Sequence, residues 1–554
     1  MMKMKNFIFA MLCFLNSPNS YSQQLETLWS DCIENNGIGK GIYERIVASS
    51  DTRIYALYKI YDLKMGAYYH HYYTLRAFDK VTMEIVKDVQ ITKKEDNNYK
   101  RLHKNPFSFN EVVLIDGSLI FFHSIYFDER AELHATVFDE NLNIIKEKTK
   151  ILETPNSSLL SYVLPKFFVS ANYETNSILA GLLVGGNYKD TAILEYKIID
   201  KDLIGKHSNK TTFPCTLIEY PRASYSLEND QTIFIQYNVK EDVSEEDTKK
   251  KDRKFITYRL IHVLSAKTGE FVNFPVYFEN KDVSDLMIET ENGICEITGF
   301  FKDLSKDPTG IKNHGLFKVQ LDIINIAVSE PKFTYFSELE INEIYRQDNV
   351  LAPMRKTKFV SIPEGLMIED YTEMPNGDRV LFCTRLNNYS NSDKDITFYS
   401  LSDCDKLDVT CMRINDLGEI QWLRTFPRRY TIDTSYASDL SGIYDENSNS
   451  LICTFGLGEA QVVHKTDDED VRTAVDYLLI NAENGQLSPK KLELNAPTTS
   501  KSDKKYVIPR LIFSLDGDLY YHYYSDPKGG PMPMVTSNLE AYEALGCLGK
   551  FFFK

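Results

Sequence analysis

The chain has 554 residues and a net charge of -16, and 43% of its residues are hydrophobic, which is enough for a large core. So negative a molecule repels phosphate backbones and anionic lipid, and no compact group of Lys and Arg compensates, so we do not expect a nucleic-acid partner. No stretch reaches the roughly 18 uninterrupted apolar residues of a transmembrane helix, so we expect no transmembrane segment.

Residues 1–22 predict a secretory signal peptide. Lys3 and Lys5 supply a positive end, residues 7–15 form a short apolar run, and small residues precede the cleavage point. The mature chain, 23–554, is predicted to be one exported domain. The periplasm, the outer membrane surface and the extracellular space remain open as destinations.

A β-hairpin pattern recurs along the mature chain. Its clearest copy is residues 407–429, in which apolar residues alternate on both sides of a polar turn at 415–418. Further copies have turns near Asp79, Asp139, Asp200, Ser265, Asp322 and Asn481. We interpret the D-x-x-G patterns at these hairpins as turns and not as metal sites.

A second hairpin precedes each of these, so the repeating unit has four strands. Its first turns fall at Ser50-Asp51, Asp116-Gly117, Asn176, Asn229-Asp230, Asn292-Gly293, Asn376-Gly377, Asn449-Ser450 and Asp516-Gly517. The Asn-Gly and Asp-Gly dipeptides tolerate positive φ and predict tight type I′ turns. Stacking such sheets around an axis buries both faces of each, so we predict an all-β fold, a β-propeller of eight four-stranded blades, with seven as the alternative.

Ring closure and two interruptions complete the predicted architecture. The last unit is incomplete, so we expect residues 24–29 to supply its missing edge strand. The mixed charges of residues 240–254 indicate a solvated loop. Residues 337–364 predict a helical insertion that begins with a capping box at Ser337 and Glu340. One side of this helix would be formed by Leu339, Ile341, Ile344 and Tyr345.

Five of the nine cysteines fall into two groups. Cys295, Cys383 and Cys453 occupy similar places in three repeats. Neighbouring sheets lie about 10 Å apart, whereas bridged cysteines need Cα atoms within about 7 Å, so we interpret these three as core residues. Cys404 and Cys411 are close in sequence and are the best candidates for a disulfide, although Cys411 is also compatible with a core position.

Histidine and tyrosine concentrate in the first, second and eighth units, which would be neighbours in a closed ring. Tyr faces and His donors can stack on and hydrogen-bond a sugar or peptide. The alternative is that these are ordinary strand residues packed in the core. The candidate ligand-binding residues are His70, His71, Tyr73, His123, His522 and Tyr524. We expect no metal site here, because adjacent His70 and His71 point to opposite faces of a strand.

No catalytic motif accompanies the repeats. GxSxG, HExxH and a phosphate loop are absent, and nothing selects a catalytic pair among the 79 acidic residues. The turn from Ser265 to Gly269 is similar to that of quinoprotein-type blades, but Ser265 replaces their usual aspartate and the docking tryptophan is missing. We therefore predict no quinone and no other cofactor.

Residues 336–554 resemble a family of exported bacterial propeller-like proteins that is largely uncharacterised. The resemblance is carried by MPNGDRVLFCTR from Met374, DVTCMRINDLGEIQWLRTFPRR from Asp408 and GKFFFK from Gly549. It implies a propeller fold and export. The leading hypothesis is a non-enzymatic binding or scaffolding protein of the bacterial envelope that engages a protein or a glycan. The alternative is a carbohydrate-active hydrolase or lyase with an axial active site.

Overall fold

The structure is a computed structural model. It describes residues 25–30, 33–35, 42–64, 68–92, 107–127, 129–155, 166–185, 192–213, 224–228, 232–242, 255–291, 293–306, 312–323, 325, 327–345, 359–391, 403–406, 408–426, 430–433, 440–455, 474–493, 504–507, 513–515, 518–526 and 544–553. The predicted signal peptide lies outside these residues. Within them, no helix is both long and apolar enough to cross a membrane.

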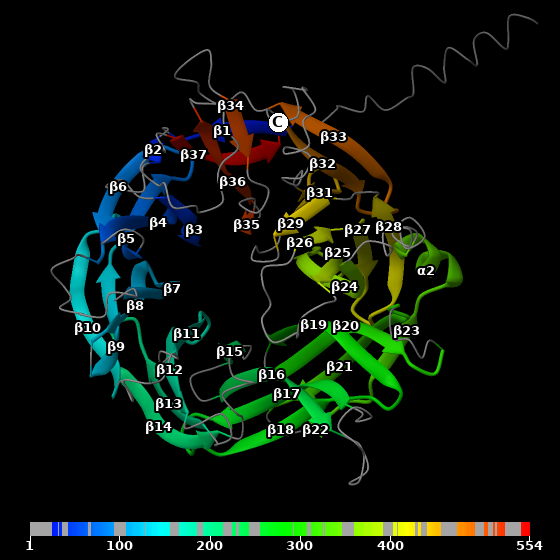
Figure 1. Cartoon of the computed structure of the whole chain (residues 1–554), viewed down its shortest axis with the longest axis horizontal. Helices are drawn as coiled ribbons and strands as arrows, with labels where there is room; N and C mark the ends of the chain where they lie inside the picture. Colours follow the sequence, from blue (N-terminus) through cyan, green and yellow to red (C-terminus); the bar gives the residue numbers. More distant parts are fainter. Residues whose placement is uncertain are drawn as a thin grey trace, which may run out of the picture.

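The described residues form eight antiparallel sheets arranged as a ring around a common axis (Figure 1). Sheet 1 contains β3 (Ile42–Ser49), β4 (Arg53–Lys64), β5 (Tyr68–Asp79) and β6 (Ile85–Gln90). Sheet 2 contains β7 (Phe107–Ile115), β8 (Ser118–Tyr126), β9 (Arg130–Phe138) and β10 (Ile144–Pro155). Sheet 3 contains β11 (Lys166–Asn172), β12 (Ser177–Gly185), β13 (Ala192–Ile199) and β14 (Gly205–Phe213). In each, the first strand lies nearest the axis and the fourth at the rim.

Sheets 4 to 7 continue the ring. Sheet 4 contains β15 (Ser224–Leu227), β16 (Thr232–Asp242), β17 (Phe255–Ser265) and β18 (Phe271–Val276). Sheet 5 contains β19 (Lys281–Glu291), β20 (Ile294–Asp303), β21 (Gly315–Asp322), β22 (Ala327–Val328) and β23 (Lys332–Tyr335). Sheet 6 contains β24 (Phe359–Glu373), β25 (Arg379–Asn391), β26 (Asp403–Lys406), β27 (Val409–Ile414), β28 (Ile420–Phe426) and β29 (Tyr430–Asp433). Sheet 7 contains β30 (Leu440–Asp445), β31 (Ser450–Phe455), β32 (Ala474–Asn481) and β33 (Leu487–Glu493).

The closing sheet joins the two ends of the chain. It contains β34 (Lys504–Val507), β35 (Phe513–Leu515), β36 (Asp518–Asp526) and β37 (Ala544–Phe553), together with β1 (Leu25–Trp29) and β2 (Ile33–Asn35). β1 pairs antiparallel with β37 from Leu25 opposite Phe553 to Trp29 opposite Gly549. The predicted all-β propeller and its closure by the N-terminal segment are thus confirmed.

The core lies between successive sheets. Phe122 and Leu133 of sheet 2 pack with Ile178 and Leu182 of sheet 3, and all four are buried. Each sheet contributes both of its faces to such layers, because alternate residues of a strand point to opposite sides. This arrangement explains why the central strands have near-continuous apolar runs.

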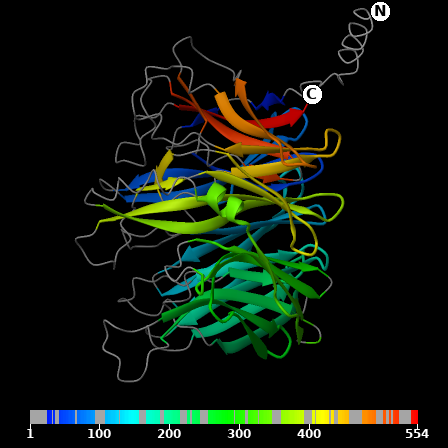
Figure 2. The same cartoon turned by 90° about the vertical axis from the view of Figure 1, so that its right-hand side faces the viewer.

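The connections between strands alternate between two faces of the ring, because consecutive strands are antiparallel. The connections from first to second and from third to fourth strands define the short-turn face. Figure 2 views the ring edge-on, with coloured hairpin turns projecting on its right-hand side. The two turns of one sheet contact each other: Lys80 N donates to Thr52 O at 3.0 Å, and Ala482 N donates to Asn449 O at 3.1 Å. All other connections define the long-connection face.

The tight turns depart from the sequence prediction in one respect. Asp116 and Gly117 both have positive φ, 49° and 71°, as a type I′ turn requires. At Asn376-Gly377, however, only Gly377 has positive φ, and Met374 N donates to Asp378 O at 2.8 Å. The hairpin loop therefore contains three residues and not two, and Gly377 occupies its left-handed position.

A short helix, α2 (Glu338–Ile344), lies outside sheet 6 and contacts β28 (Figure 1). The capping box predicted at Ser337 and Glu340 is present. Ile344 and Tyr345 are buried, as expected. The side expected to contain Leu339, Ile344 and Tyr345 is buried only in part, because Leu339 is 81% exposed.

The disulfide expected between Cys404 and Cys411 is contradicted. Cys404 on β26 pairs with Asn388 and Cys411 on β27 pairs with Phe382, which places them six residues apart along β25, or about 20 Å. A disulfide requires Cα atoms within about 7 Å. Cys411 is a buried free thiol. The predicted core positions of Cys295, Cys383 and Cys453 are confirmed, because all three are buried free thiols.

Candidate functional site

The predicted His and Tyr sector maps onto three successive sheets of the ring (Figure 1). His70, His71 and Tyr73 lie on β5, His123 lies on β8, and His522 and Tyr524 lie on β36. The backbone therefore brings the closing sheet, sheet 1 and sheet 2 together, as the repeat pattern predicted. The side chains of His70, His71, His522 and Tyr524 lie outside the described part of the structure.

Tyr73 and His123 are packed in the layer between sheets 1 and 2. They are 4% and 1% exposed. The Tyr73 ring lies 6.4 Å from that of Phe121, and the Phe121 ring lies 5.8 Å from that of His123. His123 also stacks on His134 of β9, with ring centroids 5.9 Å apart. For these two residues the core-packing interpretation fits, since neither ring is open to a ligand from solution.

A different set of polar side chains joins the innermost strands to one another. Asn110 of β7 donates through Nδ2 to Phe167 O of β11 at 3.1 Å. On the other side of the ring, Asp370 Oδ2 of β24 accepts from Gly442 N of β30 at 2.8 Å. Each contact runs from one inner strand to the inner strand of the next sheet. These hydrogen bonds therefore link the inner strands that surround the axis, at the inner edge of the apolar core.

Asp285 makes the same kind of contact and has distinctive electrostatics. Its Oδ2 on β19 accepts from Ile368 N of β24 at 2.7 Å. Burial raises the pKa of Asp285, although backbone N–H donors and the charge of Arg259 act in the opposite direction. Burial also raises the pKa of Asp282, three residues earlier, against the opposing charge of Lys302. Two carboxyl groups on one inner strand thus favour their protonated forms more than usual.

Sequence reasoning missed these inner-strand groups. Their positions follow from strand register, which sets which side chain of β19 faces β24, and register cannot be read from a run such as KDVSDLMIE. The available signal was a charged residue, Asp285, immediately before the apolar run Leu286–Ile288. Within the described residues, no three His, Cys, Asp or Glu side chains are grouped as metal ligands would be.

The short-turn face is held by side chains of its own turns. Asp139 Oδ1 accepts from the N–H groups of Asn141 and Asn143 at 2.9 and 2.8 Å. Asn415 Oδ1 repeats this pattern with Leu417 N and Glu419 N at 3.0 and 2.8 Å. The interpretation of these polar residues as turn formers is confirmed.

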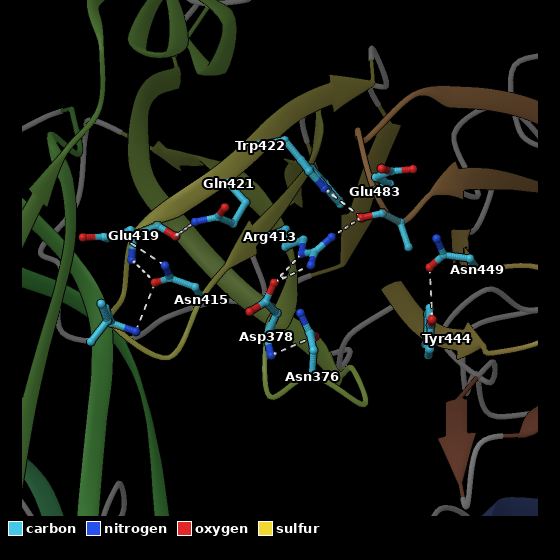
Figure 3. Close-up of polar contacts among 12 residues, drawn as sticks. Asn376, Asp378, Arg413, Asn415, Glu419, Gln421, Trp422, Tyr444, Asn449 and Glu483 are labelled. Atoms are coloured by element: carbon cyan, nitrogen blue, oxygen red, sulfur yellow. Dashed lines mark hydrogen bonds and ion pairs between the residues drawn. The ribbon is translucent and has the colours of Figure 1, made fainter.

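Neighbouring sheets also clasp each other at this face (Figure 3). Trp422 Nε1 of sheet 6 donates to Ala482 O in a turn of sheet 7 at 3.0 Å, and Arg413 Nη1 donates to the same oxygen at 2.8 Å. Arg413 Nη2 also pairs with Asp378 Oδ2 at 2.5 Å. Because its polar groups already have intramolecular partners here, this part of the short-turn face serves the ring itself.

Comparison with known proteins finds distant similarity to solved structures alone. No family model matches the chain, and no curated protein matches it. Among solved structures, the Dos1 propeller is similar over 95% of both chains at 10% identity, with a TM-score of 0.40. The WD40 domain of SCAP from fission yeast is similar over 95% of this chain and 98% of its own at 6% identity, with a TM-score of 0.36. The polysaccharide lyase Uly1 is similar over 93% and 90% at 11% identity, with a TM-score of 0.33.

Proposed function

We propose that the protein is an exported, non-enzymatic β-propeller of the bacterial envelope that binds a protein or glycan partner through its long-connection face. The observation that carries the proposal is the unequal distribution of chain between the two faces. On the short-turn face, two residues connect β7 to β8. Between strand ends at the opposite face, the sequence has residues 243–254 after β16, 392–402 after β25, 456–473 after β31 and 527–543 after β36.

A closed ring is a suitable support for such connections. Pairing of β1 with β37 joins the chain ends, and polar contacts such as that of Asp370 with Gly442 tie the inner strands together. Binding residues of many proteins lie on loops that a rigid scaffold positions. The proposal assigns partner recognition to the long connections and stability to the ring.

The test is affinity purification of the tagged protein from its native envelope, with variants that separate the two faces. One variant replaces residues 456–473 by a short Gly-Ser linker, and a matched control replaces exposed Leu417 of the short-turn face by Ala. We expect a partner at reproducible stoichiometry with the wild type and the control, and its loss with the linker variant. A partner that is lost only with the Leu417 variant would contradict the proposal, as would recovery of the protein alone.

Asp285 favours a second candidate, a carbohydrate-active hydrolase or lyase with an axial active site. A carboxyl group with a raised pKa on an innermost strand is a feature that general acids share. Asp285→Asn retains an acceptor for Ile368 N and removes the titrating group. Release of reducing ends or unsaturated products from envelope polysaccharide by the wild type, and its loss in Asp285→Asn, would favour the enzyme over the binding protein.

A further inference from the structure

Aromatic and charged side chains gather at the long-connection end of sheet 5. Lys281 begins β19, Asp303 ends β20 and Tyr335 ends β23. The Tyr335 hydroxyl donates to Asp303 Oδ2 at 2.7 Å and accepts from Lys281 Nζ at 2.9 Å. Lys281 Nζ lies 3.3 Å from the same carboxylate, and the two side chains are 17% and 4% exposed. A largely buried ion pair therefore fixes the position of Tyr335.

The Tyr335 ring is open to solvent and lies among cations. Tyr335 is 41% exposed, and the ammonium of exposed Lys306 lies 3.8 Å from its ring centroid. Lys281 Nζ lies 5.4 Å from the same centroid. On its inner side the ring packs edge-on against Phe301, with centroids 5.1 Å apart. Because Asp303 compensates the charge of Lys281, the Lys306 ammonium adds one positive charge at the ring, which favours a ligand that carries an anion.

A group of phenylalanines supports the Tyr335 ring. Phe301 packs against Phe333 with ring centroids 5.1 Å apart, and Phe333 packs against Phe278, again at 5.1 Å. Tyr277, the residue before Phe278, is 46% exposed, and its ring packs edge-on against Tyr258 with centroids 6.1 Å apart. This patch joins flat aromatic surface to positive charge on a chain whose net charge is -16.

We propose that this patch is a binding subsite for an acidic saccharide unit of a glycan chain. The exposed Lys306 side chain, whose ammonium lies over the Tyr335 ring, turns to pair with the sugar carboxylate, and the uncovered face of Tyr335 stacks against the sugar ring. An acidic peptide would supply the carboxylate but not the flat ring that covers Tyr335. This inference rests on the proposed function and names the partner class of that face.

The test uses the mature protein and three soluble polymers: polygalacturonate, neutral dextran and poly-L-glutamate. Affinity electrophoresis in gels that contain each polymer measures binding. Because the protein is strongly acidic, general charge attraction cannot retard it in a polyanion. We expect polygalacturonate to bind at least about tenfold more tightly than either other polymer. Dextran lacks the carboxylate and poly-L-glutamate lacks the sugar ring, and losing one such contact reduces affinity by about this factor.

The variants separate the subsite from the rest of the surface. Tyr335→Ala and Lys306→Gln should each weaken polygalacturonate binding about tenfold, whereas Tyr335→Phe should retain most of it because the ring remains. Tyr173→Ala and Lys267→Gln are matched controls, since both residues are exposed on the short-turn face. They should bind as the wild type does. Circular dichroism shows whether each variant is folded.

Several results would overturn the subsite. They are failure to bind polygalacturonate, equal binding of dextran or poly-L-glutamate, and equal losses in the control variants. The envelope purification is independent of these measurements. If it recovers a partner that depends on residues 456–473 while polygalacturonate does not bind, the glycan subsite falls and the proposed function stands.

Discussion

The two faces of the ring use the ends of the same strands for different purposes. On the short-turn face, turns such as that at Asn415 satisfy their own backbone donors, and the carbonyl of Ala482 accepts from the preceding sheet. On the long-connection face, the described part of sheet 5 keeps the Tyr335 ring and the Lys306 ammonium open to solvent. The polar groups of these short turns bond within the ring, whereas at sheet 5 the internal bonds of Tyr335 hold an aromatic ring at the surface.

The clasp of the short-turn face repeats around the ring. Tyr55 OH donates to Glu140 O of the next sheet at 2.9 Å, and Tyr196 OH donates to Ala266 O of the next sheet at 2.9 Å. Burial raises the pKa of both tyrosines to about 12, so both hydroxyls remain protonated donors at physiological pH. Three sheets thus place an aromatic donor against the corresponding turn of the next sheet, with Trp422 as the third donor, although the donors lie on different strands.

Breaking one clasp should have the largest effect. Trp422 is 5% exposed and is one of two donors to Ala482 O, so Trp422→Ala removes a buried ring and leaves that oxygen with Arg413 as its donor. We expect the free energy of unfolding to fall by about 4 kcal/mol, measured by denaturant titration. The control is Leu417→Ala on the same face, where a 60% exposed side chain should cost less than about 0.5 kcal/mol. Equal losses would show that the clasp does not hold the ring.

Removing the Asp303 carboxylate, which holds Tyr335 at the long-connection face, should destabilise the fold nearly as much. The size of this loss should depend on pH. The Ser305 hydroxyl, Tyr335 and Lys281 hold the pKa of Asp303 well below its usual range. Such a group stabilises the fold above its unfolded pKa of about 3.9, and this contribution is lost as pH falls through and below that value. Asp303→Asn should lower the free energy of unfolding at pH 7 by about 3 kcal/mol.

Comparing denaturation of the two proteins across pH checks this sign. The difference between wild type and Asp303→Asn should shrink as pH falls from about 5 to about 2. Asp116→Asn, at a solvent-exposed turn of the short-turn face, should leave stability nearly unchanged at every pH. A difference for Asp303→Asn that stays constant with pH would mean that its charge does not matter.

The layer between sheets 6 and 7 should tolerate added side-chain volume poorly. A Cβ at Gly442 on β30 would lie 1.9 Å from Cε2 of Phe382 on β25 of the neighbouring sheet, so Gly442→Ala forces sheets 6 and 7 apart at this point. We expect a loss of about 2 kcal/mol by denaturant titration. Gly205→Ala is the matched control, because a Cβ there meets nothing within 4 Å. If both variants were equally stable, sheets 6 and 7 would be packed more loosely here than the contact of Gly442 with Phe382 implies.

The ring was predictable from sequence because each of its determinants is local. Alternating apolar residues, turn dipeptides such as Asp116-Gly117 and an incomplete last unit sufficed for the strands and for closure by β1. The candidate site was not predictable in the same way. Asp285 and Tyr335 acquire their roles from residues in other strands, Ile368 and Lys281, and those pairings depend on register and inter-sheet packing. For Tyr73 and His123 the aromatic pattern marks core packing, because aromatic residues are also favoured in buried strands.

Shortening a long connection should have the smallest effect on stability, and this result would define the division between the faces most sharply. Replacing residues 456–473 with a short flexible linker leaves β31 and β32 paired, since their register runs from Ser450 opposite Asn481 to Thr454 opposite Tyr477. Loop-closure entropy changes by only about 0.6 kcal/mol for each doubling of length, so the free energy of unfolding should change by less than about 1 kcal/mol. Denaturant titration measures this change beside partner binding by the same variant. A large loss of stability would mean that these residues belong to the ring, and that loss of a partner could not be assigned to recognition by the long-connection face.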